Sequence, residues 1–188
     1  MSTALDAAED VELGIRLLAG TPTQEGRDPE LLRRWVLTAT EFGEGLAAGP
    51  CRARIVEREG GLERKLLARY TSRPPTVELY VDTIALAERL VDERGWGHWY
   101  PQGSVRAAAL AHEAAHHELH HGPAKKELRQ LLDHQVLRLG RWKVTGHVAG
   151  AEEIAAHAYA RTACGLGRSP LHLTAALAAA VTSNRRET

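Results

Sequence analysis

A run of histidines inside one predicted helix constrains the fold of this chain more than any other feature. Ser104 is a favourable N-cap residue and Gly122-Pro123 stops a helix, so the sequence predicts a helix over residues 104–121. Five of the ten histidines lie in this helix, namely His112, His116, His117, His120 and His121. Because an α-helix has about 3.6 residues per turn, His112 and His116 lie one turn apart on the same face. Both imidazoles can therefore point at one place in the folded chain.

The residues between these two histidines suggest what the pair does. Residues 112–116 read His-Glu-Ala-Ala-His, the HExxH pattern in which two imidazoles bind Zn²⁺ and the glutamate is a general base. Glu113 lies about 100° round the helix from His112, close enough to reach a zinc-bound water without binding the metal. In the expected mechanism zinc lowers the pKa of its water to about 7, Glu113 takes the proton, and the hydroxide attacks a peptide carbonyl.

A catalytic zinc site needs a third protein ligand and one open position. The downstream candidates are Glu152, Glu153, His157 and His147. Glu153 and His157 are four residues apart and share one face of a helix predicted over residues 151–164, whereas Glu152 points elsewhere. If this helix packs on the HExxH helix, Glu153 completes the site and His157 forms a hydrogen bond to a ligand. The alternative, with His157 as third ligand and Glu153 turned away, stays open.

These paired motifs resemble those of the gluzincin peptidases, in which HExxH is followed on a later helix by ExxxD. Leu110–His117 and Glu153–Ala160 look like the corresponding motifs of the small ImmA/IrrE-type branch, whose second motif tends to read Glu-x-Glu-Ala-Asp/Asn-x-Phe-Ala. The resemblance covers about residues 52–165. It implies a minimal zincin-like fold with Zn²⁺ as cofactor. His112, His116 and Glu153 would be the ligands and Glu113 the base.

The chain departs from that pattern at two positions. Ala155 stands at the second glutamate and His157 at the Asp/Asn position, so the groups around the ligands differ more than the ligands themselves. In gluzincins a tyrosine or histidine stabilises the oxyanion, and the candidates for this role are Tyr159, Tyr100 and His147. His117 and His121 form a second pair at the same spacing, which we expect to be exposed or to neighbour the ligands.

The rest of the sequence predicts an α+β fold, with a small antiparallel sheet packed on the HExxH helix. Further helices are expected over residues 3–19, 29–46 (with Asp28 as N-cap and Pro29 at the first helical position), 83–93, 125–139 and 169–181. Strands are expected over residues 52–58, 65–70 and 76–81. A substrate strand could add to the sheet edge, for which we expect residues 76–81. We divide the chain into an N-terminal helical segment, residues 1–50, and a zincin-like metallopeptidase domain, residues 51–188.

The composition indicates which binding partners and which cellular compartment to expect. The chain has 24 lysines and arginines and 24 aspartates and glutamates, so bulk charge predicts neither nucleic acid nor an anionic membrane as partner. Cys51 and Cys164 have no CxxC spacing, which argues against a disulfide scaffold and a thiolate zinc site. Residues 1–14 lack the features of a secretory signal, and the apolar residues 171–181 are too few to span a bilayer. We therefore expect a cytoplasmic protein.

Three other interpretations compete with a peptidase that acts on a protein or peptide substrate, a regulatory protein being one candidate substrate. The HExxH pattern can arise by chance on a helix this rich in histidine. A zinc-binding regulatory or interaction protein could keep the fold with little proteolytic activity, although the presence of Glu113 argues against it. A transcriptional regulator would need a basic recognition face, which residues 1–50 lack. The sequence leaves the oligomeric state open.

Overall fold

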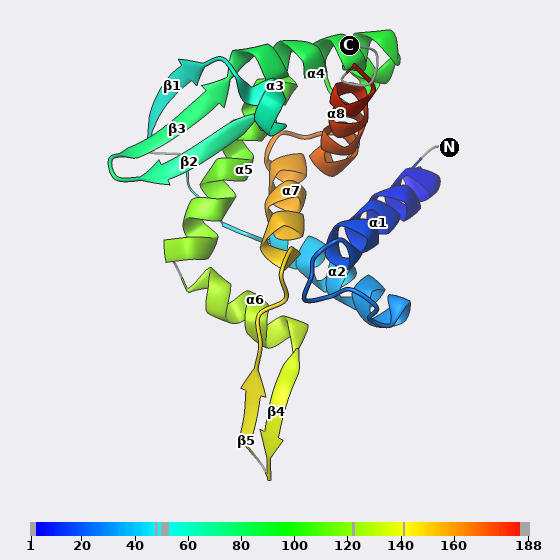
Figure 1. Ribbon diagram of the computed structural model, residues 1–188, viewed down its shortest axis with the longest axis vertical. Coiled ribbons are helices and arrows are strands. Elements are labelled where there is room, and N and C mark those ends of the chain that lie inside the picture. The colour runs from blue at the N-terminus through cyan, green and yellow to red at the C-terminus, as the bar shows by residue number, and fades with distance from the viewer. Residues whose placement is uncertain (1–2, 48, 50–52, 122, 141, 185–188) are drawn as a thin grey trace.

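The computed structural model of the chain describes residues 3–47, 49, 53–121, 123–140 and 142–184, and it has an α+β fold (Figure 1). The helices are α1 (Thr3–Ala19), α2 (Pro29–Glu44), α3 (Gly61–Arg64), α4 (Val81–Glu93), α5 (Ser104–His121), α6 (Ala124–Leu132), α7 (Ala151–Ala163) and α8 (Pro170–Asn184), with a 3₁₀ turn η1 (Trp96–His98). The strands are β1 (Arg54–Arg58), β2 (Ala68–Ser72), β3 (Pro75–Tyr80), β4 (Gln135–Leu139) and β5 (Trp142–Thr145).

The three-stranded sheet is mixed, so the prediction of an antiparallel sheet was wrong for one of its two pairings. Its strand order is β1-β3-β2, with β1 parallel and β2 antiparallel to β3. The chain leaves β1, turns through α3 and runs back along β2. It then reverses direction again into β3, so β3 runs in the same direction as β1. The expected edge strand is therefore the central one, and the edge strand β2 packs on α5.

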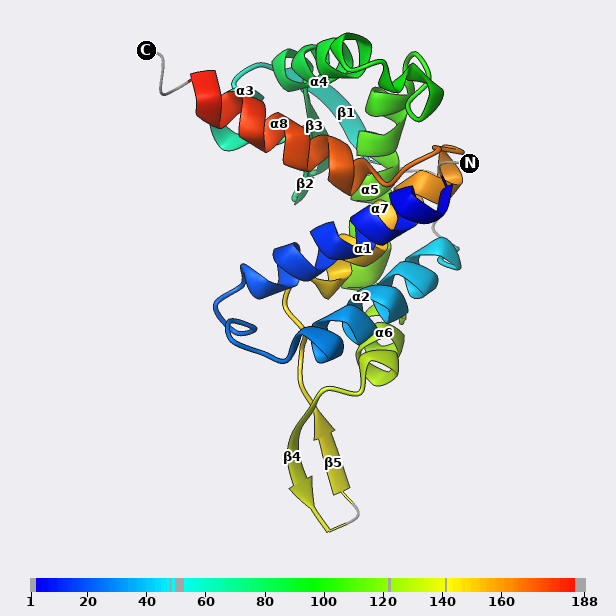
Figure 2. The ribbon, with the colours of Figure 1, turned by 90° about the vertical axis from the view of Figure 1, so that its right-hand side faces the viewer.

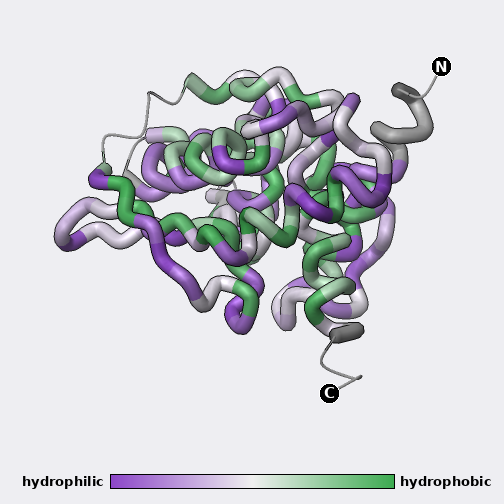
Figure 3. Tube along the Cα trace, turned by 90° about the horizontal axis from the view of Figure 1, so that it is seen from above, coloured by the Kyte–Doolittle hydropathy of each residue, from purple (hydrophilic) through white to green (hydrophobic). Residues whose placement is uncertain are grey.

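Two clusters of buried apolar side chains hold the elements together. The first lies between the sheet, α4, the first half of α5 and α8, and includes Val77, Leu79, Leu90, Val105 and Leu177. The second joins α1, α2, α6 and α7 to the end of α5, and includes Leu18, Trp35, Leu119, Leu128 and Ile154. Hydrophobic and hydrophilic segments alternate along the chain, as expected of helices with one buried face (Figure 3). The helices α5 and α7 reach both clusters.

The N-terminal helices pack closely on the rest of the chain. The side chain of Asp28 caps α2 by accepting a hydrogen bond from the amide of Glu30, as predicted for this N-cap. Helix α2 packs along α7, and Trp35 donates a hydrogen bond of 3.0 Å to the carbonyl of Leu132 at the end of α6. The division at residue 50 stays a prediction.

One predicted helix was wrong over half its length. The helix expected over residues 125–139 ends at Leu132, where Asp133 adopts a left-handed conformation with φ of 42°. Residues 135–139 and 142–145 instead form the two strands of an antiparallel hairpin, β4–β5, which extends away from the body beyond α6 (Figures 1 and 2). Within the described residues, no helix is long and apolar enough to cross a bilayer.

Candidate metal centre

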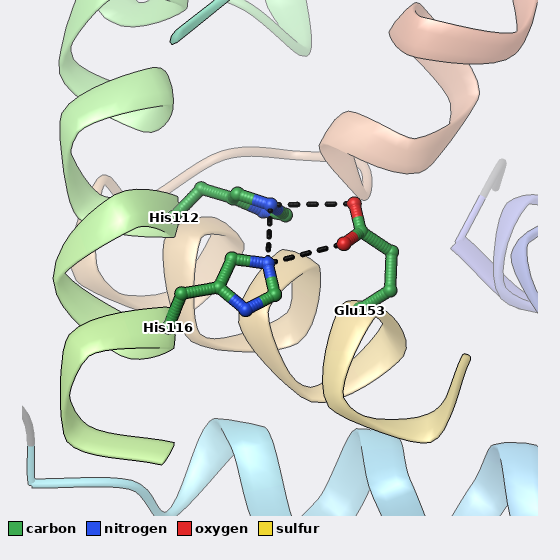
Figure 4. Close-up of side chains that lie close together, drawn as sticks. All are labelled: His112, His116 and Glu153. Carbon is green, nitrogen blue, oxygen red and sulfur yellow. Dashed lines mark hydrogen bonds and ion pairs between the residues drawn. The ribbon is translucent and has the colours of Figure 1, made fainter. Parts of the chain in front are cut away.

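The packing of α5 against α7 brings the HExxH histidines next to Glu153. His112 and His116 project from successive turns of α5, and Glu153 projects toward them from the first turn of α7 (Figure 4). Within the part of the chain that the structure describes, these three residues form the one cluster of three or more potential metal ligands. The side chain of Glu153 is 39% exposed, so the cluster can be reached from solvent.

The spacing of the donor atoms fits a single small cation. Nε2 of His112 lies 3.0 Å from Nε2 of His116 and 3.3 Å from Oε1 of Glu153, and Nε2 of His116 lies 3.1 Å from Oε2 of Glu153. Two ligands about 2.0–2.1 Å from a tetrahedral zinc ion are about 3.3 Å apart. Two imidazoles and one carboxylate, with the fourth side open, are also the donors of a catalytic zinc site. The residues present therefore fit Zn²⁺.

The backbone before α7 places Glu153. Gly150 precedes the helix with φ of 88°, which side chains rarely allow, and a Cβ atom here would lie 2.8 Å from the side chain of Leu17. Glycine thus lets the chain turn sharply into α7 directly against α1. Glu153 then falls in the first turn, where the positive end of the helix dipole favours a carboxylate.

The pKa shifts of Glu153 and His112 bear on how the cluster would bind a cation. Burial by itself raises the pKa of Glu153, but the charge of His112 and hydrogen bonds from the histidines lower it well below its ordinary range. Burial also lowers the pKa of His112, yet the adjacent carboxylate of Glu153 outweighs this effect and raises it. Glu153 is therefore ionised, and a metal ion would compete with a proton at His112.

His157 neighbours the cluster from within α7. Its Nε2 atom lies 3.2 Å from Oε1 of Glu153, one helical turn away, and its ring centre is 4.4 Å from that of His112. Burial and then the charge of His112 lower the pKa of His157, so this imidazole is neutral. This is the position expected for a group that orients the ligand Glu153. It also keeps the alternative of His157 as a ligand chemically reasonable.

Glu113 points to the other side of the cluster, toward the sheet. The side chain is buried, and its Oε2 atom accepts a hydrogen bond of 2.8 Å from the backbone amide of Tyr70 in β2. Since the amide of Tyr70 points away from β3, it belongs to the free edge of the sheet. The glutamate therefore sits between this edge and the two histidines, without joining the ligand cluster.

A cavity of about 480 Å³ opens onto the cluster. His112, Glu113, His116, His120, Glu153 and His157 line its polar end. The remainder is lined mainly by apolar side chains from three places: Leu66, Leu67 and Ala68 at β2; Val105, Ala108 and Ala109 on α5; and Leu166, Leu171 and Leu173 at α8. The cavity thus follows the free edge of β2 and is large enough to enclose several side chains of a peptide.

The three oxyanion candidates lie in different surroundings. Tyr100 lines the cavity, but it is buried and its hydroxyl donates to the carbonyl of Ser169. Tyr159 is not among the cavity-lining residues, and burial raises its pKa. His147 is half-exposed and lies 3.7 Å from Glu152. The role of all three residues in stabilising an oxyanion stays a prediction.

Sequence reasoning singled out neither His120 nor Tyr70. His120 lines the cavity, and its ring stacks on that of His116 with centres 5.9 Å apart. The i, i+4 spacing from His116 was a signal for this contact. Tyr70 contributes a backbone amide, which has no sequence signature, and its ring meets His117 edge-on at 5.4 Å. The side chain of His121 lies outside the described residues.

Glu152, the alternative carboxylate, faces another group of residues. Its side chain lies 3.2 Å from Lys125 on α6, 3.7 Å from His147 and 3.9 Å from His120. Glu152 thus points away from the pair His112 and His116, as the helical spacing predicted, although it contacts His120 at the polar end of the cavity. Glu152 and Glu153 form ion pairs with different side chains, which makes Glu152 a control for the loss of a carboxylate on α7 outside the ligand cluster.

Comparison with known proteins identifies no relative: no family model matches the chain, and no curated protein or solved structure is significantly similar to it.

Proposed function

We propose that the protein is a zinc-dependent peptidase. The observation that carries the proposal is the convergence of His112, His116 and Glu153, with donor atoms 3.0–3.3 Å apart, beside the buried carboxylate of Glu113. The order of the two motifs, which resembles that of the gluzincins and of their ImmA/IrrE-like branch, supports the same assignment. Location in the cytoplasm and action on a regulatory protein remain predictions.

The residues divide the chemistry between them. When bound by His112, His116 and Glu153, Zn²⁺ would polarise a peptide carbonyl and lower the pKa of a water to about 7. Glu113 takes the proton of the attacking water on its carboxylate and can later deliver it to the leaving amine. His157, at 3.2 Å from Oε1 of Glu153, holds that carboxylate in its orientation.

The edge of β2 gives the substrate a binding surface. In an antiparallel strand the N–H and C=O of one residue point to the same side, so the carbonyl of Tyr70 faces the same edge as its amide. An extended peptide can add to this edge and lie over α5 within the apolar cavity. The peptide bond to be cleaved is then held between the metal ligands and Glu113.

Metal content and cleavage test the proposal together. Protein expressed with zinc should hold about one ion per chain and cleave members of a mixed peptide library, detected by mass spectrometry. Glu113→Gln should retain the zinc and lower cleavage by roughly two to four orders of magnitude, because it removes a base but no ligand. Glu152→Gln is the matched control and should cleave at the wild-type rate.

Two results would count against a peptidase. Absence of stoichiometric metal would remove the zinc chemistry. Bound zinc without cleavage of any library peptide would favour the alternative, a zinc-binding regulatory or interaction protein.

A further inference from the structure

The apolar part of the cavity begins one helical turn before the histidine pair. Ala108 stands four residues before His112 on α5, on the same face of the helix and about 5.4 Å away along its axis. Ala109 stands in the same relation to Glu113, and all four residues line the cavity. Because an alanine side chain ends at Cβ, α5 leaves room here. A bound peptide whose carbonyl lies at the metal ligands can place a neighbouring side chain in this room.

Helix α8 and the segment before it supply another wall of the cavity. The residues of this stretch that line the cavity are Leu166, Pro170, Leu171, Leu173 and Thr174. The hydroxyl of Thr174 donates a hydrogen bond of 3.0 Å to the carbonyl of Leu171, so its polarity is satisfied within the helix. Leu166 and Leu173 belong to the first apolar cluster, as do Ala108 and Ala109, so core packing holds both walls in place.

This wall lies outside residues 52–165, the part of the chain that resembles known peptidases. Selectivity at the wall therefore depends on residues particular to this chain.

The cavity is too large to be a packing defect. Protein interiors contain few voids larger than a water molecule, whereas this cavity has a volume of about 480 Å³. Away from the histidines its wall consists mainly of apolar side chains, and such a wall favours an apolar guest over water. Because the proposed metal ligands and Glu113 line the same cavity, the guest is part of the substrate.

The charges that line the cavity disfavour a charged guest. Among the described residues, the lining carboxylates are those of Glu113 and Glu153, which lie at the catalytic end. A lysine or arginine side chain in the apolar part would lose its hydration without gaining a carboxylate partner. The lining cations Lys65 and Arg69 are exposed, and Arg69 already lies 3.3 Å from Glu78. A large neutral side chain thus gains most from this cavity.

We propose that the substrate residue beside the cleaved bond is large and apolar, such as leucine, methionine or phenylalanine, and that its side chain lies in the cavity against α5 and α8. This inference rests on the proposed peptidase function and names the class of its substrate. Ala108 on α5 and Thr174 on α8 determine specificity, because the side chains at these two positions set how large and how polar the guest can be.

Matched peptides test the preference in the zinc-loaded wild-type protein. A peptide that is cleaved in the mixed library is resynthesised with leucine, phenylalanine, alanine, lysine or glutamate at each of the two positions that flank the cleaved bond. At one of these positions, leucine or phenylalanine should give a kcat/KM roughly 10- to 100-fold above that of alanine, because a large apolar side chain becomes buried. Lysine and glutamate should give values no higher than that of alanine.

A charge placed in the wall should shift the preference. Thr174 is only partly buried, so the glutamate of Thr174→Glu keeps some hydration and offers a lysine side chain a partner. This variant should raise the ratio of kcat/KM for the lysine peptide to that for the leucine peptide roughly tenfold or more. Ala175→Glu is the matched control, because Ala175 is the next residue of α8 but is exposed and is not among the lining residues. It should keep the wild-type ratio.

A side chain that fills the cavity gives an independent test. Ala108→Leu should lower kcat/KM for the phenylalanine peptide roughly tenfold or more and change the value for the alanine peptide much less. Ala107→Leu is the matched control on the exposed face of α5. The zinc content and circular dichroism of Thr174→Glu, Ala108→Leu and both controls should equal those of the wild type.

Loss of cleavage and loss of preference have different meanings. If the wild type cleaves no library peptide, the proposed function is overturned and this inference falls with it. Cleavage with no preference for a large apolar residue at either flanking position, or with a preference for lysine or glutamate, overturns this inference alone. A lysine-to-leucine ratio that Thr174→Glu leaves unchanged, or that Ala175→Glu raises equally, also overturns it.

Discussion

The backbone amide of Tyr70 donates a hydrogen bond of 2.8 Å to Oε2 of Glu113. This bond joins the free edge of the sheet to the helix that carries the histidine pair. It holds the proposed base at a fixed place beside the edge to which a substrate strand would add. The sheet thus contributes to the site through its backbone as well as through its shape.

Replacing that amide should impair the chemical step. Tyr70→Pro removes the N–H, and because this N–H points away from β3 the substitution breaks no hydrogen bond of the sheet. A hydrogen bond to a charged group contributes about 1.5–3 kcal/mol, so kcat should fall by roughly 10- to 100-fold with little change in KM. Steady-state kinetics on a cleaved peptide, with zinc content measured in parallel, checks this.

Tyr70→Phe keeps the amide and is the control for the ring. It should retain the wild-type kcat and zinc content. A proline variant that turns over as fast as the wild type would show that Glu113 needs no support from β2.

The two groups on α7 should differ in their effect on zinc. Glu153→Ala removes a proposed ligand and should abolish tight binding, whereas His157→Ala should weaken affinity or activity by about 10- to 100-fold, because His157 contacts Glu153 at 3.2 Å and only orients it. Competition with a chromogenic chelator measures both affinities. Glu152→Ala should bind like the wild type. The reverse order, with His157→Ala the more severe, would make His157 the third ligand and remove the gluzincin assignment.

The pKa shifts predict how the metal-free cluster responds to pH. The pKa of Glu153 lies below its ordinary value of 4.5, so the stability it contributes is present above pH 4.5 and is lost as pH falls below that. The pKa of His112 lies above its ordinary value of 6.5, so its contribution is full below pH 6.5 and is lost as pH rises through the raised pKa. Their mutual stabilisation is therefore largest between these two pH values.

Thermal unfolding in the presence of a chelator checks this window. The Tm difference between the wild type and Glu153→Gln should be greatest between about pH 5 and 6.5 and should shrink on both sides. A difference that keeps growing toward pH 9 would contradict the raised pKa of His112.

Local sequence signals predicted the helices of the site well. The helix expected over residues 104–121 is α5 (Ser104–His121), and the one expected over residues 151–164 is α7 (Ala151–Ala163), which lies between Gly150 and Gly165. The N-cap predicted at Ser104 was wrong, because Ser104 is the first residue of α5 and its buried hydroxyl forms no hydrogen bond. The hairpin was missed, since the leucines of residues 125–139 continue a helical spacing that Asp133 interrupts by adopting a left-handed conformation. Strand order was also missed, because the position of β3 depends on the turn through α3.

The fit between α2 and α7 gives a last prediction. Gly43 of α2 lies against α7 so closely that a Cβ atom would stand 2.1 Å from the carbonyl oxygen of Ala155, a backbone atom two residues beyond Glu153. Gly43→Ala gains up to about 1 kcal/mol in helix propensity. Because that clash can be relieved only by moving a helix, the net result should be a loss of about 1–3 kcal/mol in the free energy of unfolding.

The same displacement should reach the metal site. Moving the first turns of α7 shifts Glu153 relative to His112 and His116, so the Gly43→Ala variant should bind zinc more weakly than the wild type at a temperature where both are folded. Gly45→Ala is the matched control, since a Cβ atom there meets nothing closer than 3.7 Å, from the carbonyl of Glu41. Urea unfolding and chelator competition measure the two quantities. Unchanged zinc affinity in a destabilised Gly43→Ala protein would mean that the site adjusts to the position of α7.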